Sequence, residues 1–217
     1  MQWIEKLEKN GFVQFLDFLS EQQARSYRKK LLSANHHKTW CLLTTPYRPC
    51  TRIKDNINKN SIDKYRYKQA VAARKRHQFS FSFYRSNNAH DNCHGAADIH
   101  QSFSREVVDR VSLPLGLSGD LRDTFFASFV KGQFIEYHSD GKAGKYAFVY
   151  QLSSGWQKKY GGQLTLYPRK IKFYRKIIEP RFNSLTLLKL DHPMYHSVQL
   201  LNNPKHKHRI TLSGWLE

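Results

Sequence analysis

The second half of the chain consists of short β-type runs separated by glycine, proline and asparagine. Within each run, β-branched, aromatic and leucine side chains cluster or alternate with polar ones, which favours strands over helices. The expected strands cover residues 125–129, 134–138, 146–152, 163–167, 184–190, 196–200 and 209–216. Many short strands with such breaks are typical of a sheet that closes on itself. We therefore expect a mainly β fold with added helices, organised as a double-stranded β-helix, or jelly roll.

The N-terminal part of the chain carries helix signals. Helices are expected over residues 2–10, ending at Gly11, over 21–32, opened by the capping-box pair Ser20 and Gln23, and over 102–111. Strands are expected over 12–18 and 78–84. With 217 residues, of which 40% are hydrophobic, the chain is long enough for one sizeable domain. We expect a single domain, 1–217, in which 1–120 supplies helical support on one side and a basic segment, and 121–217 forms the β-core.

The triplet His138-Ser139-Asp140 and the later His196 have the residue types of a metal site. On an extended segment, residues i and i+2 point to the same side, so His138 and Asp140 can reach one ion while Ser139 faces away. His196 follows another strand-like run and can supply a third ligand. Two imidazoles and one carboxylate occupy one face of an Fe(II) ion and leave the opposite positions open. Arg209, on the last strand, adds a two-pronged donor that matches a carboxylate inside an apolar barrel.

A His-x-Asp triplet alone is a weak signal in a chain with 11 histidines, but the order of the neighbouring segments is more specific. The triplet follows Phe-Val-Lys-Gly-Gln-Phe-Ile-Glu-Tyr. It precedes Trp156, the run Gly161-Gly162-Gln163-Leu164 and the ending Arg-Ile-Thr-Leu-Ser-Gly-Trp. In this order the C-terminal half resembles the 2-oxoglutarate- and Fe(II)-dependent dioxygenases of the prolyl hydroxylase type, in the branch that acts on intracellular proteins.

The resemblance implies a role for each of these residues. His138, Asp140 and His196 are the expected iron ligands, and Arg209 is the expected partner of the distal carboxylate of 2-oxoglutarate. Thr211, on the same strand face as Arg209, is expected to share that carboxylate. The cofactors implied are Fe(II), 2-oxoglutarate as co-substrate and O2, with ascorbate as a stimulant. The β-core is then the catalytic part, and the basic segment lies on the substrate side.

Two positions depart from the family pattern at the co-substrate end of the site. Family members often place a tyrosine where this chain has Phe129, and another where it has Gln151, and both commonly help to hold 2-oxoglutarate. We therefore expect Phe129 and Gln151 beside the co-substrate, without the tyrosine hydroxyls. The spacing from His196 to Arg209 is also longer than usual. These differences leave the iron triad intact.

Segment 48–85 is strongly basic and carries interleaved tyrosines. Its cations are offset by only Asp55 and Asp63, and the whole chain has a formal net charge of +19. Two interpretations stand: a surface for an anionic partner, with aromatics that stack on bases, or a solvated basic loop. The overall charge favours contact with nucleic acid. A second basic set comprises Lys158, Lys159, Arg169, Lys170, Lys172, Arg175 and Lys176.

The other histidines and the cysteines give weaker signals. A polar loop contains His90, Cys93 and His94, for which substrate contact is a better interpretation than a second metal site. His192, His206 and His208 are expected in turns, on the surface or behind the ligands. The three cysteines, Cys41, Cys50 and Cys93, have no metal-ligand spacing, and a disulfide between Cys41 and Cys50 is an alternative. No apolar run has membrane-spanning length and no secretory signal is present, so we expect a cytoplasmic protein without a membrane partner.

The expected function is hydroxylation of a protein side chain. The resemblance implies a prolyl residue, and the positive charge favours a target bound to nucleic acid, such as a ribosomal or translation-associated protein. One alternative is oxidative demethylation of nucleic acid, as in AlkB-type enzymes, although Trp215 stands where that pattern carries a second arginine. Another alternative is a nucleic-acid-binding module that has lost catalysis, which the intact triad opposes. The sequence does not determine the oligomeric state.

Overall fold

The computed structural model describes residues 1–33, 41–44, 59–86, 96–119, 121–141, 143–167, 175–190 and 194–217. The loop with His90, Cys93 and His94 lies outside these residues, as do Cys50, His192 and part of the basic segment. The sequence-based expectations for those positions, including the Cys41–Cys50 disulfide, therefore stay predictions.

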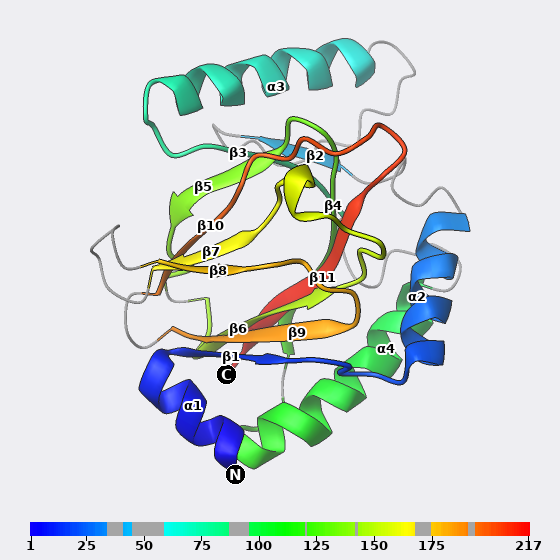
Figure 1. The fold of residues 1–217 in the computed structure, drawn as a ribbon, viewed down its shortest axis with the longest axis vertical. Coiled ribbons are helices and arrows are strands. Elements are labelled where there is room, and N and C mark those ends of the chain that lie inside the picture. The colour runs from blue at the N-terminus through cyan, green and yellow to red at the C-terminus, as the bar shows by residue number, and fades with distance from the viewer. Residues whose placement is uncertain are drawn as a thin grey trace.

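Antiparallel strands form one curled sheet, as the sequence predicts for a double-stranded β-helix (Figure 1). The strands are β1 (Phe12–Phe15), β2 (Cys41–Thr44), β3 (Phe81–Arg85), β4 (Leu121–Phe129), β5 (Phe134–His138), β6 (Tyr146–Gln151), β7 (Leu164–Tyr167), β8 (Lys176–Ile178), β9 (Ser184–Lys189), β10 (Tyr195–Val198) and β11 (Arg209–Leu216). Within the described residues their order is β1-β9-β6-β11-β4-β3-β5-β10-β7-β8, with β2 paired to β3. Strand β3 joins the two halves of this path, because it pairs with both β4 and β5.

The alternation of side chains along the strands produces two hydrophobic cores, one on each face of the sheet. On β4, Phe126 belongs to the core that packs against helices, whereas Phe125, Ala127 and Phe129 belong to the core inside the roll. Residues at i and i+2 share a face of a strand, so a single strand contributes to both cores. The inner core is where the sheet curls around a cavity.

Three helices cover the outer face of β1, β6 and β9 (Figure 1). They are α1 (Gln2–Asn10), α2 (Glu21–Ser33) and α4 (Ala96–Val107), and a π-helical turn, Val108–Ser112, extends α4. Two predicted helix boundaries are supported by geometry: Ser20 Oγ accepts from the Gln23 amide at 3.2 Å at the start of α2, and Gly11 ends α1 with a φ of 73°. Buried Leu7, Phe103 and Val107 fix these helices to the sheet.

A fourth helix, α3 (Lys59–Lys75), was not expected and lies at the opposite end of the molecule from α1 and α4 (Figure 1). The prediction that the helices flank only one side is therefore wrong. Other differences are smaller. The strands β2 and β8 were missed, the first strand ends at Phe15 rather than Phe18, and α4 begins at Ala96. The early end of β1 has a local cause, because Asp17 has a φ of 51° and breaks the extended conformation.

Asn183 connects three segments beneath the outer core. Its Oδ1 accepts hydrogen bonds from the Leu19 amide at 3.0 Å and the Tyr150 hydroxyl at 2.8 Å, and its Nδ2 donates to the Leu19 carbonyl at 2.7 Å. Its φ of 59° lies in the left-handed region that asparagine tolerates better than most residues. One buried amide thus ties the start of α2 to β6 and to the loop before β9.

We predict that Asn183→Ala lowers the free energy of unfolding by about 3 kcal/mol, because buried donors and acceptors lose their partner and alanine disfavours the left-handed conformation. Urea denaturation followed by circular dichroism measures this change. Asn202→Ala is the matched control, because Asn202 is exposed and its substitution should change stability by less than about 0.5 kcal/mol. Equal midpoints for the two variants would contradict the role given to Asn183.

Candidate metal centre and co-substrate pocket

The two candidate imidazoles face each other across a pair of antiparallel strands. In the register of β5 and β10, His138 lies opposite His196, and the two ring centroids are 4.2 Å apart. Asp140 follows two residues after His138, just beyond the end of β5. Its Oδ1 lies 3.5 Å from Nε2 of each histidine. The sheet register therefore brings together three side chains that are far apart in the sequence.

Backbone carbonyls determine which ring nitrogen of each histidine is free. The carbonyl of Glu136 accepts a hydrogen bond from Nδ1 of His138 at 2.8 Å, and that of Met194 accepts from Nδ1 of His196 at 3.4 Å. A carbonyl oxygen can only accept, so the proton is assigned to Nδ1 and the Nε2 lone pair points toward Asp140. Burial lowers the pKa of His196 to about 4, so its ring is neutral at neutral pH.

Asp140 presents one oxygen to the histidines and the other to an indole. Its Oδ2 accepts a hydrogen bond from Nε1 of Trp215 at 3.0 Å. Burial alone would raise the pKa of Asp140, but its contacts with His138, His196 and Trp215 outweigh burial and lower the pKa to about 2. The carboxylate is therefore ionised, and its orientation is fixed by a group outside the triad.

These three residues fit a divalent metal ion. One donor atom from each of His138, Asp140 and His196 lies within 4.8 Å of the others, so the group could hold an ion. Two neutral imidazoles and one carboxylate are the donor set that suits Fe(II) with open coordination positions. The side chains predicted as ligands are thus brought together, within the part of the chain that the structure describes.

Arg209 is a buried cation that lacks a partner among the described residues. It begins β11, is 1% exposed, and its Nε and Nη2 atoms make no hydrogen bond. Its guanidinium lies 5.0 Å from the centre of the Phe129 ring, and Phe129 is its register partner on β4. Burial lowers the pKa of Arg209 to about 9, so the group is still positive at neutral pH. Unpaired buried charge costs several kcal/mol, so this position is suited to an anionic ligand.

The other residues predicted at the co-substrate end surround Arg209. Thr211 lies two residues along β11, and its register partner on β6 is Gln151. Both are buried, and Oε1 of Gln151 makes no hydrogen bond within the described residues. Gln151 shares a strand face with Ala147 and Val149, which line the cavity. The structure places Phe129, Gln151 and Thr211 together as the sequence predicts, while their roles stay predictions.

A cavity of about 270 Å³ contains both ends of the site. His138, Asp140 and His196 line it together with Arg209 and Thr211. Aromatic side chains supply much of the remaining wall: Phe79, Phe81, Phe83, Phe125, Phe129 and Trp215. Such an apolar wall lowers the local polarity, which would strengthen the attraction between Arg209 and an anion.

The glycine pair in the run Gly161-Gly162-Gln163 has a structural explanation. A Cβ at Gly161 would lie 2.1 Å from the carbonyl oxygen of Leu200, and one at Gly162 would lie 3.0 Å from Cδ of Arg209. Both residues also have positive φ, at 70° and 73°. These glycines allow the loop before β7 to approach the stem of Arg209 closely.

Several candidate residues lie outside the site. His206 is exposed, and His208 contacts the Ser128 hydroxyl at 3.2 Å through Nδ1. Of the second basic set, Lys158 and Lys159 lie in a 3-10 turn and Lys176 starts β8, whereas Arg169, Lys170 and Lys172 lie outside the described residues. Phe79 was not expected at the site, yet its ring centroid lies 5.5 Å from that of His138. The alternating phenylalanines of 79–83 were the only sequence signal for it.

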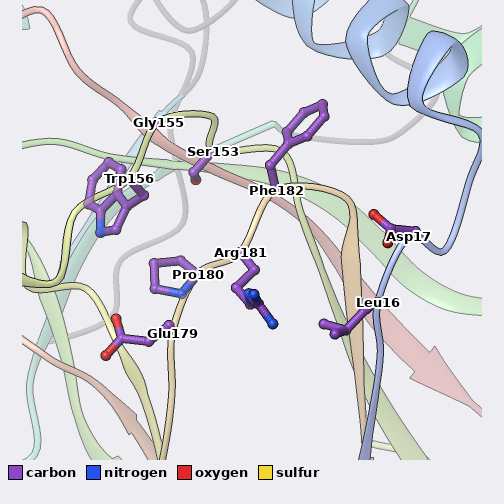
Figure 2. A pocket seen from close by; sticks show the side chains of 9 residues that line it. All are labelled: Leu16, Asp17, Ser153, Gly155, Trp156, Glu179, Pro180, Arg181 and Phe182. Atoms are coloured by element: carbon purple, nitrogen blue, oxygen red, sulfur yellow. The ribbon is translucent and has the colours of Figure 1, made fainter.

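A second cavity, of about 360 Å³, lies between three loops at the edge of the sheet. Figure 2 shows Trp156 and Phe182 on its walls, with Asp17, Glu179 and Arg181 from the loops before α2 and β9. It contains none of the predicted metal ligands. Its mixture of both charges with apolar groups gives no single ligand chemistry, so we assign it no role.

Comparison with known proteins agrees with this geometry. Residues 125–217 match the 2OG-Fe(II) oxygenase superfamily. No curated protein sequence matches the chain. Among solved structures, it is similar to a prolyl hydroxylase in complex with a hypoxia inducible factor oxygen degradation domain peptide fragment from Trichoplax adhaerens. The TM-score is 0.66 at 18% identity, covering 99% of this chain and 86% of that one.

Two further structures show the same fold. A Pseudomonas putida prolyl-4-hydroxylase gives a TM-score of 0.61 at 17% identity and covers 100% of this chain and 97% of its own. A viral collagen prolyl hydroxylase from Paramecium Bursaria Chlorella virus-1, solved as a 2OG complex, gives a TM-score of 0.56 at 13% identity, with 97% of each chain covered.

Among the described residues, no helix is both long and apolar enough to cross a membrane.

We predict that Trp215→Phe weakens binding of Fe(II), or of Co(II) as a stable substitute, by about 10- to 100-fold, because the Asp140 carboxylate loses the donor that orients it. Anaerobic calorimetric titration measures the affinity. Trp156→Phe is the matched control, because the Trp156 indole donates to the Gly161 carbonyl at 2.9 Å and does not contact the triad. If both variants bind metal like the unmodified protein, the indole does not position the ligand.

Proposed function

We propose that this chain, whose residues 125–217 match the 2OG-Fe(II) oxygenase superfamily, hydroxylates a prolyl side chain of a protein. It is a 2-oxoglutarate-dependent dioxygenase, with Fe(II) as metal and O2 as co-substrate. The observation that carries the proposal is one cavity that contains both a two-histidine, one-carboxylate cluster and a buried arginine without a partner.

In this proposal the two ends of the cavity have different tasks. His138, Asp140 and His196 hold the iron, since their free donor atoms face one point. Arg209 pairs with the distal carboxylate of 2-oxoglutarate through a two-pronged contact, and Thr211 donates to the same group. Gln151 and Phe129 close this end, Gln151 with its amide and Phe129 with its ring face under the guanidinium.

The bound groups supply the oxidising chemistry, in which 2-oxoglutarate, O2 and a C–H bond give succinate, CO2 and an alcohol. The side chains of this protein provide binding and orientation. The carbonyls of Glu136 and Met194 keep the two imidazoles unprotonated at Nε2, and Trp215 keeps one oxygen of Asp140 directed at them. The phenylalanine walls exclude water from the reacting atoms. No general base is needed.

The choice of a prolyl substrate is supported by the cavity walls and by the similar structures. A prolyl ring is neutral and aliphatic, and it matches a wall made largely of phenylalanine. The Trichoplax adhaerens prolyl hydroxylase, to which 99% of this chain is similar in fold, was solved with a peptide fragment. On the last strand, Trp215 is engaged with Asp140, at the position where the AlkB-type pattern carries an arginine. A protein substrate is therefore favoured over a methylated base.

We further propose that the substrate protein is associated with the ribosome or with RNA and that the reaction takes place in the cytoplasm. The formal net charge of +19 supports the first point, because a basic protein is attracted to RNA-rich assemblies. A reducing compartment, which keeps iron ferrous, suits the second.

We predict that the purified protein with Fe(II), 2-oxoglutarate and ascorbate forms succinate slowly without substrate, and that His138→Ala reduces this formation to background because the iron site loses a ligand. His206→Ala is the matched control, since His206 is exposed and away from the cavity. Succinate is measured by mass spectrometry. A protein that binds 2-oxoglutarate but never forms succinate would be a binding module and not an enzyme.

We predict that Arg209→Lys raises the KM for 2-oxoglutarate by about 100-fold while metal affinity is retained, because lysine cannot make the two-pronged contact. Arg181→Lys, on an exposed loop, should leave the KM unchanged. An unchanged KM in Arg209→Lys would assign the distal carboxylate to another residue.

Mass spectrometry of candidate substrates tests the proposed substrate class. Candidate ribosomal proteins and proline-containing peptides should gain one oxygen atom in the presence of the enzyme and 2-oxoglutarate. Methylated oligonucleotides are the competing arm, and loss of a methyl group from these without any oxygen gain by protein would replace hydroxylation with demethylation.

A further inference from the structure

Among the described residues, helix α3 contacts the body of the protein along one side. Ala70 and Ala73 are buried, the Tyr67 hydroxyl donates to the Gly132 carbonyl at 3.0 Å, and Arg74 forms an ion pair with Glu136 on β5. The Arg74 guanidinium also lies 4.9 Å from the centre of the Phe134 ring. These contacts fix the orientation of α3, so its opposite side faces solvent in a defined direction.

The free side of α3 carries a row of lysines, which we call the lysine row. Lys64, Lys68 and Lys75 are all exposed. At 100° per residue they lie within about 40° of one another around the helix axis, and they extend over about 16 Å along it. Within the described residues, none of them forms an ion pair, and the helix has no acidic side chain from residue 64 to its end. The row is therefore an uncompensated line of positive charge.

An aromatic ring lies beside the lysine row. Tyr65 is 62% exposed, so most of its ring is open to solvent. The Gln69 amide donates to the Tyr65 hydroxyl at 2.7 Å and restrains the ring. Exposed Arg76 follows at the C-terminal end of the helix. Cations in line with an exposed, restrained aromatic ring are the features that bind single-stranded nucleic acid.

The C-terminal end of α3 is connected by a short segment to one wall of the cavity. Five residues connect α3 to β3, and one of them, Phe79, is 48% exposed and lines the cavity beside His138. The ion pair between Arg74 and Glu136 joins the same helix to β5, the strand that ends at His138. A partner bound at the C-terminal end of α3 would therefore lie near the part of the cavity wall formed by Phe79 and His138.

We propose that the lysine row and Tyr65 bind single-stranded RNA and so bring an RNA-associated protein substrate to the cavity. The lysines contact successive phosphates, and Tyr65 stacks on an unpaired base. The Gln69 amide oxygen is available to a ribose 2′-hydroxyl. The choice of RNA rests on the proposed function, in which the substrate is an RNA-associated protein. An acidic protein could match the positive charge of the lysine row, but its carboxylates do not stack on the exposed Tyr65 ring as a base does.

The first test measures RNA binding to the full-length protein by fluorescence anisotropy with a labelled oligouridylate. The variant Lys64→Glu/Lys68→Glu/Lys75→Glu should bind at least about tenfold more weakly at low salt, and the slope of log affinity against log salt should fall by about 2. The matched control is Lys6→Glu/Lys9→Glu/Lys29→Glu, in which three exposed lysines of α1 and α2 are reversed. Both variants have the same net charge, and lysine and glutamate have similar helix propensities.

The control separates a local site from general attraction to a basic protein. Weaker binding in the α3 variant alone supports the lysine row. Equal weakening in both variants, or in neither, overturns it. An oligodeoxyuridylate that competes as well as the ribo-oligomer overturns RNA as the ligand, and polyglutamate that competes as well as RNA assigns the row to an acidic protein.

The second test concerns the ring. Tyr65→Ala should weaken RNA binding by about fivefold or more, because one stacked base is lost, whereas Tyr65→Phe should keep most of the affinity. If alanine and phenylalanine bind alike and as tightly as tyrosine, no base stacks there and the proposed mode of binding is wrong. Circular dichroism of each variant checks that α3 is retained.

Succinate formation without substrate, measured on the same samples, separates this proposal from the proposed function. The α3 variants should form succinate at the normal rate, because the lysine row is outside the cavity. Loss of RNA binding with normal succinate formation supports an α3 site that acts apart from the chemistry. If the unmodified protein forms succinate and does not bind RNA, the α3 site is rejected and the enzyme is retained.

Discussion

The register between β5 and β10 is the constraint on which the site depends. It sets His138 opposite His196, and a shift by one residue would turn one of these rings to the outer face of the sheet. The register is itself held from both sides, because β3 pairs with β5 and β7 pairs with β10. The convergence of three side chains that are far apart in the sequence is thus fixed by many backbone hydrogen bonds. Because the paired strands hold both histidines in place, the cluster can form even though Asp140 lies beyond the end of β5.

The opposite end of the cavity shows how the fold accommodates a buried charge. Arg209 is held by its place on β11, by the ring of Phe129 and by the close approach of Gly162, none of which neutralises it. The protein therefore keeps a destabilising group in its interior, and an anion bound beside it would remove that cost. The burial that makes the unpaired charge of Arg209 destabilising also strengthens the attraction of this charge to a carboxylate.

The C-terminal half could be predicted from sequence because its signals are periodic and ordered. Strand alternation placed Phe129, His138 and Arg209 on strands, and the succession of motifs indicated the iron ligands. Contacts that depend on the tertiary fold could not be predicted, such as the indole of Trp215 on Asp140. Helix α3 was missed for a physical reason: its buried residues are alanines and it attaches through Tyr67 and Arg74, so it lacks the apolar stripe by which helices are identified.

That difference in attachment separates the two sides of the molecule. Helices α1, α2 and α4 share a continuous apolar core with β6 and β9, so their positions are coupled to the sheet and to the residues at its centre. Helix α3 is oriented by a hydrogen bond to the β4–β5 turn and an ion pair to β5, with small buried alanines, and its exposed lysines lie on another side, so changes to these lysines alter no buried packing. A surface of this kind can acquire charge or a new partner at little cost to stability. The basic residues of α3 therefore lie where a binding surface can change without disturbing the core or the nearby cavity.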